Sequence, residues 1–332
     1  MNPTLSPVKP CSAVNFFAPI ARDLDEVERI LSENLDNARP GVDRLLAHLA
    51  HYKGKRLRPT LLLLTAQACG KVTSAHHLLG AVVEMIHTAT LVHDDVLDNA
   101  NVRRHVATVN SLWGNQASIL LGDYLFTHAF HLSSTLDDVR ACQIIGEATN
   151  RLCAGELQQI CSRGNLDLTE EEYFEIIDGK TAELTACACK LGAMYAGMSD
   201  DVVARLTSFG RSLGAAFQIA DDLLDLLGEE TLAGKSLGTD LEQQKLTLPL
   251  IHLLQTAPKE QVTRVRSILK AAGNHKREAL LPQLRAAGSL EYARGKAEAF
   301  ATSALAELEC LPSSPEREIL ETLTDRVVHR DH

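Results

Sequence analysis

The sequence predicts an all-α protein folded as one domain, and three observations carry this expectation. Aromatic residues are only 4% of the 332 residues, and no run alternates β-branched with polar residues, so strands are poorly supplied. Apolar residues instead recur at helical spacing between glycine and proline breaks. The chain is long enough for two domains, but no linker long enough to separate them interrupts this pattern.

The expected elements follow in chain order. Residues 1–19 form a loose leader, because they contain four prolines and lack the continuous apolar run of a secretory signal. Pro59 fits the first turn of a helix, and Ser74 is expected to cap the next one, a long helix ending at Asp98. His76 and His77 are expected to face solvent at its start. Helices are predicted at about 24–35, 42–51, 59–69, 74–98, 119–125, 138–161, 169–197, 200–228, 240–256, 260–272, 276–287, 289–310 and 314–330.

Composition restricts the classes of function. The formal net charge of −10 argues against a general nucleic-acid-binding protein, so an anionic substrate needs local basic clusters or metal ions. The eight cysteines include no CxxC pair and are expected to be reduced and buried, as in a cytoplasmic protein. No stretch approaches the roughly 20 apolar residues of a membrane span, so a soluble protein is expected.

Two acidic motifs share one spacing. Asp94 and Asp98 are four positions apart, so a helix places both on one face, where like charges repel unless a cation lies between them. A hard divalent ion with oxygen ligands, such as Mg²⁺, suits such a pair. A single motif of this kind could be a solvated acidic helix end. The motif recurs, however, at Asp221, Asp222 and Asp225, again after an apolar run, which favours a site that holds Mg²⁺ and through it a diphosphate.

Basic residues form a second signal. Residues 53–58 contain four cations where a loop meets a helix, and positive charge at a helix N-terminus is unfavourable unless an anion binds there. Arginine is suited to bidentate contact with phosphate, although a solvated basic loop is the ordinary alternative. Lys180, Thr181, Gln218 and Lys235 add further polar groups near the acidic motifs, each a weak signal by itself.

With these segments in view, the chain resembles the trans (all-E) isoprenyl diphosphate synthases, most closely the long-chain polyprenyl members. The resemblance spans residues 24 to 332 and keeps the family's order. It implies an isoprenoid-synthase-type helix bundle with a central Mg-diphosphate cavity, formed by residues 20–332, and a cytoplasmic homodimer. The matching segments are GKRLRP at 54–59, EMIHTATLVHDDVLD at 84–98, RR at 103–104, LLGDYLF at 120–126, GKTAEL at 179–184, FQIADDLLD at 217–225, GKSLGTD at 234–240 and KLTLPL at 245–250.

The resemblance also implies roles. Isopentenyl diphosphate would be held by Lys55, Arg58, His87 and Arg104. The allylic side would be lined by Arg103, Lys180, Thr181, Gln218 and Lys235. The metal ligands for roughly three Mg²⁺ ions per active site would be Asp94, Asp98, Asp221 and Asp225, with Asp95 and Asp222 completing the catalytic set. His105, Lys53 and Gln244 stand where the family usually has glycine, which affects loop shape and removes no charged ligand.

Product length can be argued from the helix before Asp94. A helix turn rises about 5.4 Å, close to one extended isoprene unit, so a bulky side chain on this face would act as a floor for the growing chain. Thr90 and Ala89 are small where short-chain relatives generally have an aromatic residue. The expected product is longer than geranylgeranyl, with Ile86 and Met85 also in the chain-length pocket.

Several alternatives remain. A short-chain farnesyl or geranylgeranyl synthase and a non-catalytic partner subunit belong to the same family, although a partner subunit tends to lose aspartates. A terpene cyclase would share only the first acidic motif, and a metal phosphohydrolase would leave the second unexplained. Glu84 and His87 match half of a di-iron helix-bundle motif, but no second half is found. The sequence does not determine product length, primer or any partner protein.

Overall fold

The structure is a computed structural model that describes residues 18–36, 39–52, 54–228, 238–271 and 275–329. The expected leader lies outside the described residues except for its last two positions, and Lys53 and Lys235 also lie outside them. The all-α prediction is confirmed. β structure in the described part of the chain is limited to a hairpin of two-residue strands, β1 (Val102–Arg103) and β2 (Val106–Ala107).

The first half of the chain forms the larger of two apolar clusters. Long helices α4 and α6 pack against each other, and α3 packs on α4 and on α9 from the second half. The helices of this half are α1 (Ala21–Leu35), α2 (Pro40–Leu49), α3 (Leu57–Ala68), α4 (Ser74–Leu97), α5 (Val109–Trp113), α6 (Asn115–Ser133) and α7 (Val139–Cys161).

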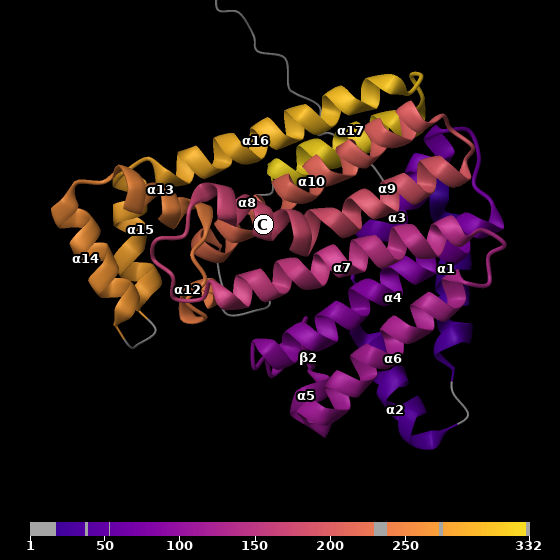
Figure 1. Cartoon of the computed structure of the whole chain (residues 1–332), viewed down its shortest axis with the longest axis horizontal. Helices are drawn as coiled ribbons and strands as arrows, with labels where there is room; N and C mark the ends of the chain where they lie inside the picture. Colours follow the sequence, from indigo (N-terminus) through magenta and orange to yellow (C-terminus); the bar gives the residue numbers. More distant parts are fainter. Residues whose placement is uncertain (1–17, 37–38, 53, 229–237, 272–274, 330–332) are drawn as a thin grey trace, which may run out of the picture.

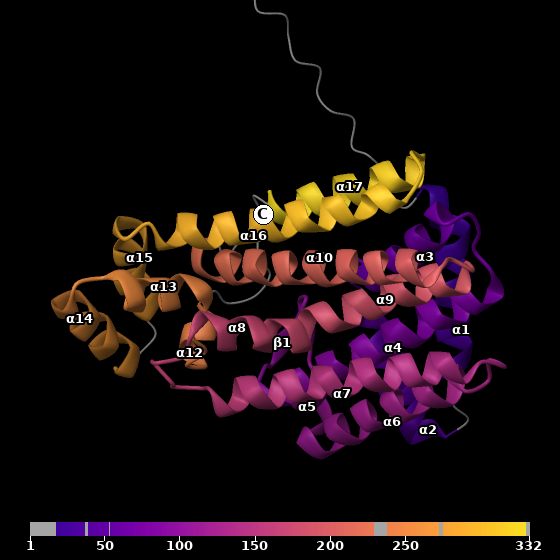
Figure 2. The same cartoon turned by 45° about the horizontal axis from the view of Figure 1, so that its top comes forward.

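The second half of the chain contributes to the first apolar cluster and forms most of a second one. Helix α10 and the long α16 contribute to both clusters, whereas α13, α14 and α15 form a separate lobe, orange in Figure 1. Figure 2 shows α16, α10, α9 and α7 stacked as successive rows. The elements are α8 (Glu170–Ile177), the π-helical turn η3 (Asp178–Ala182), α9 (Glu183–Tyr195), α10 (Asp200–Leu227), α12 (Thr239–Glu242), α13 (Leu248–Thr256), α14 (Lys259–Lys270), α15 (Lys276–Ala286), α16 (Ser289–Glu307) and α17 (Pro315–Val328). No helix in the described part of the chain is long and apolar enough to cross a membrane.

The start of α4 differs in detail from the sequence expectations. Thr73, not Ser74, caps α4, and its partner in the capping box is His76. His76 is fully buried: its Nδ1 accepts a hydrogen bond from the Thr73 backbone N–H at 3.0 Å, and its Nε2 lies 3.1 Å from the Gly192 carbonyl oxygen. His77 is half-buried against Asp23, so the expectation that both histidines face solvent is wrong.

Two predicted helices are interrupted. The helix expected at 169–197 continues through the π turn, and the helix expected at 240–256 divides into α12 and α13 around a loop. Lys245 lies in that loop, so the interruption carries a charged side chain to the cavity. Gly179 lies inside the π turn and Pro249 in the first turn of α13, but neither residue alone specifies a break of this kind, and the predicted helices ran through both.

Candidate active site

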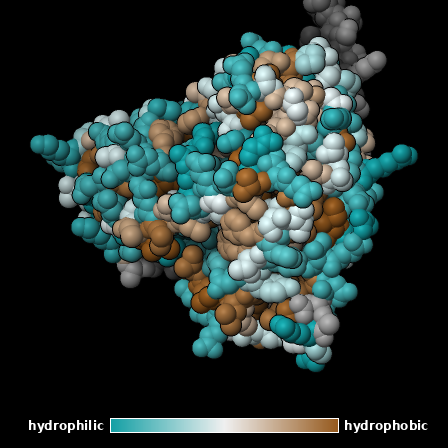
Figure 3. Space-filling view, turned by 45° about the vertical axis from the view of Figure 1, so that its right-hand side comes forward, coloured by the Kyte–Doolittle hydropathy of each residue, from teal (hydrophilic) through white to brown (hydrophobic). Residues whose placement is uncertain are grey.

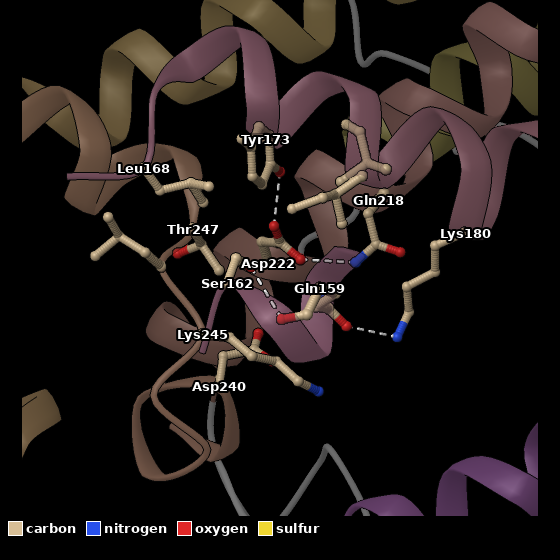
Figure 4. A pocket seen from close by; sticks show the side chains of 13 residues that line it. Gln159, Ser162, Leu168, Tyr173, Lys180, Gln218, Asp222, Asp240, Lys245 and Thr247 are labelled. Carbon is tan, nitrogen blue, oxygen red and sulfur yellow. Dashed lines mark hydrogen bonds and ion pairs between the residues drawn. The ribbon is translucent and has the colours of Figure 1, made fainter. Parts of the chain in front are cut away.

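The two acidic motifs lie at the C-terminal ends of α4 and α10, near one hollow that Asp222 of the second motif lines. Figure 4 shows this hollow with Tyr173 above Asp222 and with Lys180 and Lys245 along its sides. Its lining combines the end of α7, the start of α8, the π turn, α10 and the loop before α13. Residues more than 80 positions apart are therefore brought to one place.

Within the first motif the three aspartates have different surroundings. Asp95 is 1% exposed and points into the protein, where it accepts hydrogen bonds from Arg103 Nε at 2.7 Å and Tyr52 Oη at 3.0 Å. Burial raises the pKa of Asp95, and the Arg103 guanidinium and the two hydrogen bonds oppose this rise. Asp95 thus holds the β1 hairpin and Arg103 in position against α4.

Asp98 faces two cations that the sequence reasoning did not assign to the site. Arg163, just after α7, lies 3.1 Å from Asp98, and Lys245 lies 3.5 Å from the same oxygen. Lys245 also lies 3.9 Å from Asp240. These ion pairs connect the end of α4 with α7 and with the loop that follows the second motif.

Asp94 is the least engaged carboxylate of the first motif. Burial raises the pKa of Asp94 to about 6, Lys180 opposes the rise, and Glu156 and Asp98 add to it. Within the described residues it makes neither a hydrogen bond nor an ion pair, and the same is true of Asp221 in the second motif.

The other two aspartates of the second motif are fully engaged. Asp222 accepts hydrogen bonds from Tyr173 Oη and Gln218 Nε2, each at 2.7 Å. Burial raises the pKa of Asp222 to about 8, and the negative charge of Asp240 adds to the shift. Asp225 accepts from the Thr239 hydroxyl at 3.0 Å and from the Asp240 backbone N–H at 3.3 Å, so its carboxylate organises the start of α12.

The π turn sets the positions of Lys180 and Thr181. Lys180 Nζ lies 2.8 Å from Glu156 and donates to Gln159 Oε1 at 2.9 Å, while the Thr181 hydroxyl donates to Gln218 Oε1 at 2.6 Å. A single extra residue in the helix redirects side chains, and π turns frequently occur at functional sites. Lys180 is therefore directed at the hollow and is close to Asp94.

Backbone contact between α7 and the π turn forms one wall of the site. A Cβ on Gly155 would lie 2.6 Å from the Lys180 backbone nitrogen, and a Cβ on Gly179 would lie 2.8 Å from the Arg151 carbonyl oxygen. Neither glycine can be replaced without separating the two elements.

A cluster of cations lies beside the first motif. His87 has Arg58, Arg104 and Arg103 as electrostatic neighbours, and burial together with these charges lowers its pKa well below the usual value. The Arg58 Nε is buried and has no hydrogen-bond partner among the described residues. Arg104 donates to the Tyr52 carbonyl oxygen at 2.6 Å. Binding of an anion would stabilise this concentration of positive charge. Lys55, the fourth expected ligand of isopentenyl diphosphate, is exposed at the edge of the cluster.

The predicted chain-length residues lie on α4 but differ in burial. Met85, Ile86 and Ala89 are at most 1% exposed and belong to the larger apolar cluster. Thr90 is half-buried and its hydroxyl donates to the His87 carbonyl oxygen at 2.7 Å. Glu84 is paired with Arg56 at 2.7 Å, which excludes the di-iron interpretation of Glu84 and His87 in this conformation.

The donor set fits an open magnesium site. No three acidic, histidine or cysteine side chains of the described residues are close enough together to hold a metal ion by themselves. Mg²⁺ is usually bound through one or two carboxylates with substrate phosphates and water completing its shell. Asp94 and Asp221, which have hard oxygen donors and no bonded partner in the described chain, fit this requirement. Asp225 fits it less well, because α12 already engages both of its carboxylate oxygens.

His105 and Gln244 stand where the family usually has glycine, and both keep a glycine-like backbone conformation. His105 has φ of +65° and Gln244 has φ of +58°, both in the left-handed region. A side chain in this region costs roughly 1–2 kcal/mol. The loop shapes are therefore retained at a cost in stability, and charged side chains beside them keep their places.

These features define a class: an all-α fold with paired aspartate motifs and a separate cluster of cationic side chains. The comparisons then identify the family. A sequence model described as polyprenyl synthetase matches residues 39–284. The chain belongs to the polyprenyl synthetase family and is a trans-prenyltransferase.

Relatives match over nearly the whole chain. Octaprenyl diphosphate synthase of Escherichia coli (strain K12) is 38% identical over 312 residues, covering 94% of this chain and 97% of the relative. A decaprenyl diphosphate synthase structure from Rhodobacter capsulatus is 36% identical with a TM-score of 0.89, covering 96% and 98%. A polyprenyl synthase structure from Caulobacter crescentus CB15, complexed with calcium and isoprenyl diphosphate, is 33% identical with a TM-score of 0.90, covering 98% and 100%.

Proposed function

We propose that this protein joins isopentenyl diphosphate head to tail to an allylic diphosphate, and repeats the step to make a long-chain all-trans polyprenyl diphosphate. The observation that carries the proposal is the presence of two different sets of charged side chains, each suited to a diphosphate. Asp94 and Asp221 offer unpaired carboxylates for metal ions, whereas Arg58 and Arg104 offer guanidiniums for direct contact. The similarity to octaprenyl and decaprenyl synthases over nearly the whole chain supports a long product.

The allylic diphosphate would be oriented by Lys180, Thr181, Gln218 and Arg103. Its C–O bond breaks with the electron pair leaving on the diphosphate, and Lys180 stabilises the negative charge that grows there. Bound Mg²⁺, held by Asp94, Asp98, Asp221 and Asp225, would supply further neutralisation of that charge. The binding of calcium and isoprenyl diphosphate by the relative from Caulobacter crescentus supports metal-assisted diphosphate binding, with roughly three Mg²⁺ ions expected here.

Isopentenyl diphosphate would bind Arg58, Arg104, His87 and Lys55. Its double bond attacks the allylic carbocation, the new C–C bond forms, and a proton passes from the adjacent carbon to the released diphosphate. A dedicated protein base is not needed. The low pKa of His87 keeps the imidazole neutral, so it can donate one hydrogen bond without adding another charge to the cluster.

The assembly would be a homodimer. Leu112 and Trp113 on α5, and Ile119 and Leu120 at the start of α6, are between 42% and 68% exposed. Clustered exposed apolar side chains are typical of protein contact sites. Figure 3 shows hydrophobic side chains gathered toward the lower end of the molecule, where α5 lies in Figure 1. We further propose that residues 20–332 form one domain and that the enzyme works in the cytoplasm, where its cysteines, free in the described chain, stay reduced.

The deciding experiment incubates the protein with farnesyl diphosphate, radiolabelled isopentenyl diphosphate and Mg²⁺, with and without EDTA, and resolves the products by chain length. A metal-dependent series ending at one product longer than geranylgeranyl is expected. Products ending at three or four isoprene units would make this a short-chain synthase. Absence of incorporation with every allylic primer would favour a non-catalytic partner subunit.

A further inference from the structure

Arg211, on the helix that carries the second acidic motif, bridges the two ends of the π turn. Its guanidinium lies 2.5 Å from Asp178 and 2.5 Å from Glu183. These are also the two residues whose backbones close the turn, since the Glu183 N–H donates to the Asp178 carbonyl oxygen. The Glu183 side chain is only 10% exposed, and Arg151 adds a second ion pair to it at 3.1 Å. One arginine thus ties together the side chains that flank the inserted residue.

One face of α10 contacts the π turn at three successive positions along the helix. Arg211 holds its ends, Gly214 packs against it, and Gln218 accepts the hydrogen bond of Thr181. A Cβ on Gly214 would lie 2.6 Å from the Ala182 Cα, so the helices touch backbone to backbone. The spacing of three and four residues places these groups on one helical stripe. Helix α10 therefore determines where the turn sits and which way its side chains point.

We propose that Arg211 is a positioning residue for allylic diphosphate binding, acting by holding the π turn in register. Without its guanidinium, the carboxylates of Asp178 and Glu183 repel each other across the turn. An α-helical register then becomes favourable, and one residue of register shift rotates the following side chains by about 100°. Lys180 and Thr181 would leave the partners that direct them into the hollow, Glu156 and Gln218. The inference rests on the proposed function, because the affected ligand is its allylic substrate.

The isopentenyl site provides an internal reference. Arg58, His87 and Arg104 lie on α3, α4 and the β1–β2 turn, whereas the ion pairs of Arg211 are with Asp178 and Glu183 at the π turn. A general loosening of the protein would weaken the binding of both substrates together. A shifted π turn should weaken the binding of the allylic substrate alone.

The test compares Arg211→Gln with Arg205→Gln in the full-length protein. Arg205 is a matched control: it lies on the same helix, its side chain is 34% exposed against 32% for Arg211, and it pairs with Glu307 at 2.9 Å far from the hollow. Steady-state kinetics would give kcat and the KM of each substrate. Calorimetry with an unreactive farnesyl thiolodiphosphate and Mg²⁺ would give allylic affinity without turnover.

For Arg211→Gln the expected result is a roughly tenfold rise in allylic KM and in the analogue Kd, with a roughly tenfold lower kcat, since misplacement of about 1 Å can cost up to a hundredfold. The isopentenyl KM should stay within about twofold, and Arg205→Gln should leave all constants within about twofold. Arg211→Lys, which can contact one carboxylate at a time, should recover part of the loss.

Equal rises in both KM values, or an Arg211→Gln profile like that of Arg205→Gln, would overturn the inference. If Arg211→Gln does not fold, Arg211→Lys is measured in the same way: a partial and selective loss of allylic affinity supports the inference, and an unchanged affinity overturns it. Failure of the wild-type protein to bind the analogue or turn over any allylic primer would instead refute the proposed function.

Discussion

Replacing Tyr52 by phenylalanine should destabilise the fold by about 3 kcal/mol through the loss of one oxygen atom. Tyr52 is 3% exposed, and its hydroxyl donates to the buried Asp95 carboxylate and accepts the Val109 backbone N–H at 3.1 Å. A hydrogen bond to a charged group contributes about 1.5–3 kcal/mol, and a buried donor left without an acceptor costs about 1–3 kcal/mol. Taking the lower part of each range gives about 3 kcal/mol. The phenyl ring keeps the packing, so no cavity larger than the hydroxyl forms.

The assay is urea unfolding of the full-length protein at constant pH, comparing midpoints at unchanged slope. The control is Tyr292→Phe, which also removes a hydroxyl bonded to a carboxylate, that of Glu170 at 2.6 Å. Glu170 is partly exposed and keeps its ion pair with Lys296 at 2.7 Å, so the control should lose about 1 kcal/mol or less. Equal losses in both variants, or less than about 1 kcal/mol for Tyr52→Phe, would refute the reasoning.

Four further predictions test other parts of the account. Asp94→Ala should lower kcat by at least about a thousandfold while circular dichroism and unfolding stay near wild type, and a wild-type rate would contradict its metal-binding role. Ala89→Tyr should shorten the product resolved by chromatography, because a bulky ring replaces a fully buried methyl group on the face where the growing chain is expected to extend. An unchanged product length would contradict the chain-length role of this position. Burial lowers the pKa of His76 from its ordinary 6.5, so the unfolded chain binds more protons. The stability from neutral His76 is full above about pH 6.5 and declines as the pH falls below it, and His76→Gln should flatten this part of the urea-midpoint profile. Gln244→Gly should raise stability by up to about 1 kcal/mol by relieving left-handed strain, and a loss would show that the glutamine side chain stabilises the loop.

Much of this molecule follows from local pattern. Helical periodicity located nearly all the helices, and the spacing of Asp94 to Asp98 and of Asp221 to Asp225 indicated the ends of α4 and α10, which lie near one hollow. These succeed because amphipathic spacing and charge clustering are properties of neighbouring residues. The expected charged ligands stay a prediction, and the structure adds which of them already have partners within the described chain.

What the sequence could not reveal depends on distant contacts. Tyr52, Arg163 and Arg211 occur in segments without a distinguishing pattern, yet each pairs with a carboxylate at least 28 positions away. The π turn has no sequence signature because it differs from an α-helix only in which carbonyl each N–H selects. His76 appeared to be a surface histidine because its neighbours are polar, and only the position of Gly192 shows that the site is closed.

The close contact of Gly155 with Gly179 restricts how the wall formed by α7 and the π turn can vary. Main chain meets main chain there, so a mutational library has no side chain to exchange without separating the elements. On α4, by contrast, Met85, Ile86 and Ala89 pack into the larger apolar cluster through their side chains. Our proposal therefore expects product length to change, in evolution or by design, through α4, while the contact of α7 with the π turn is inherited unchanged.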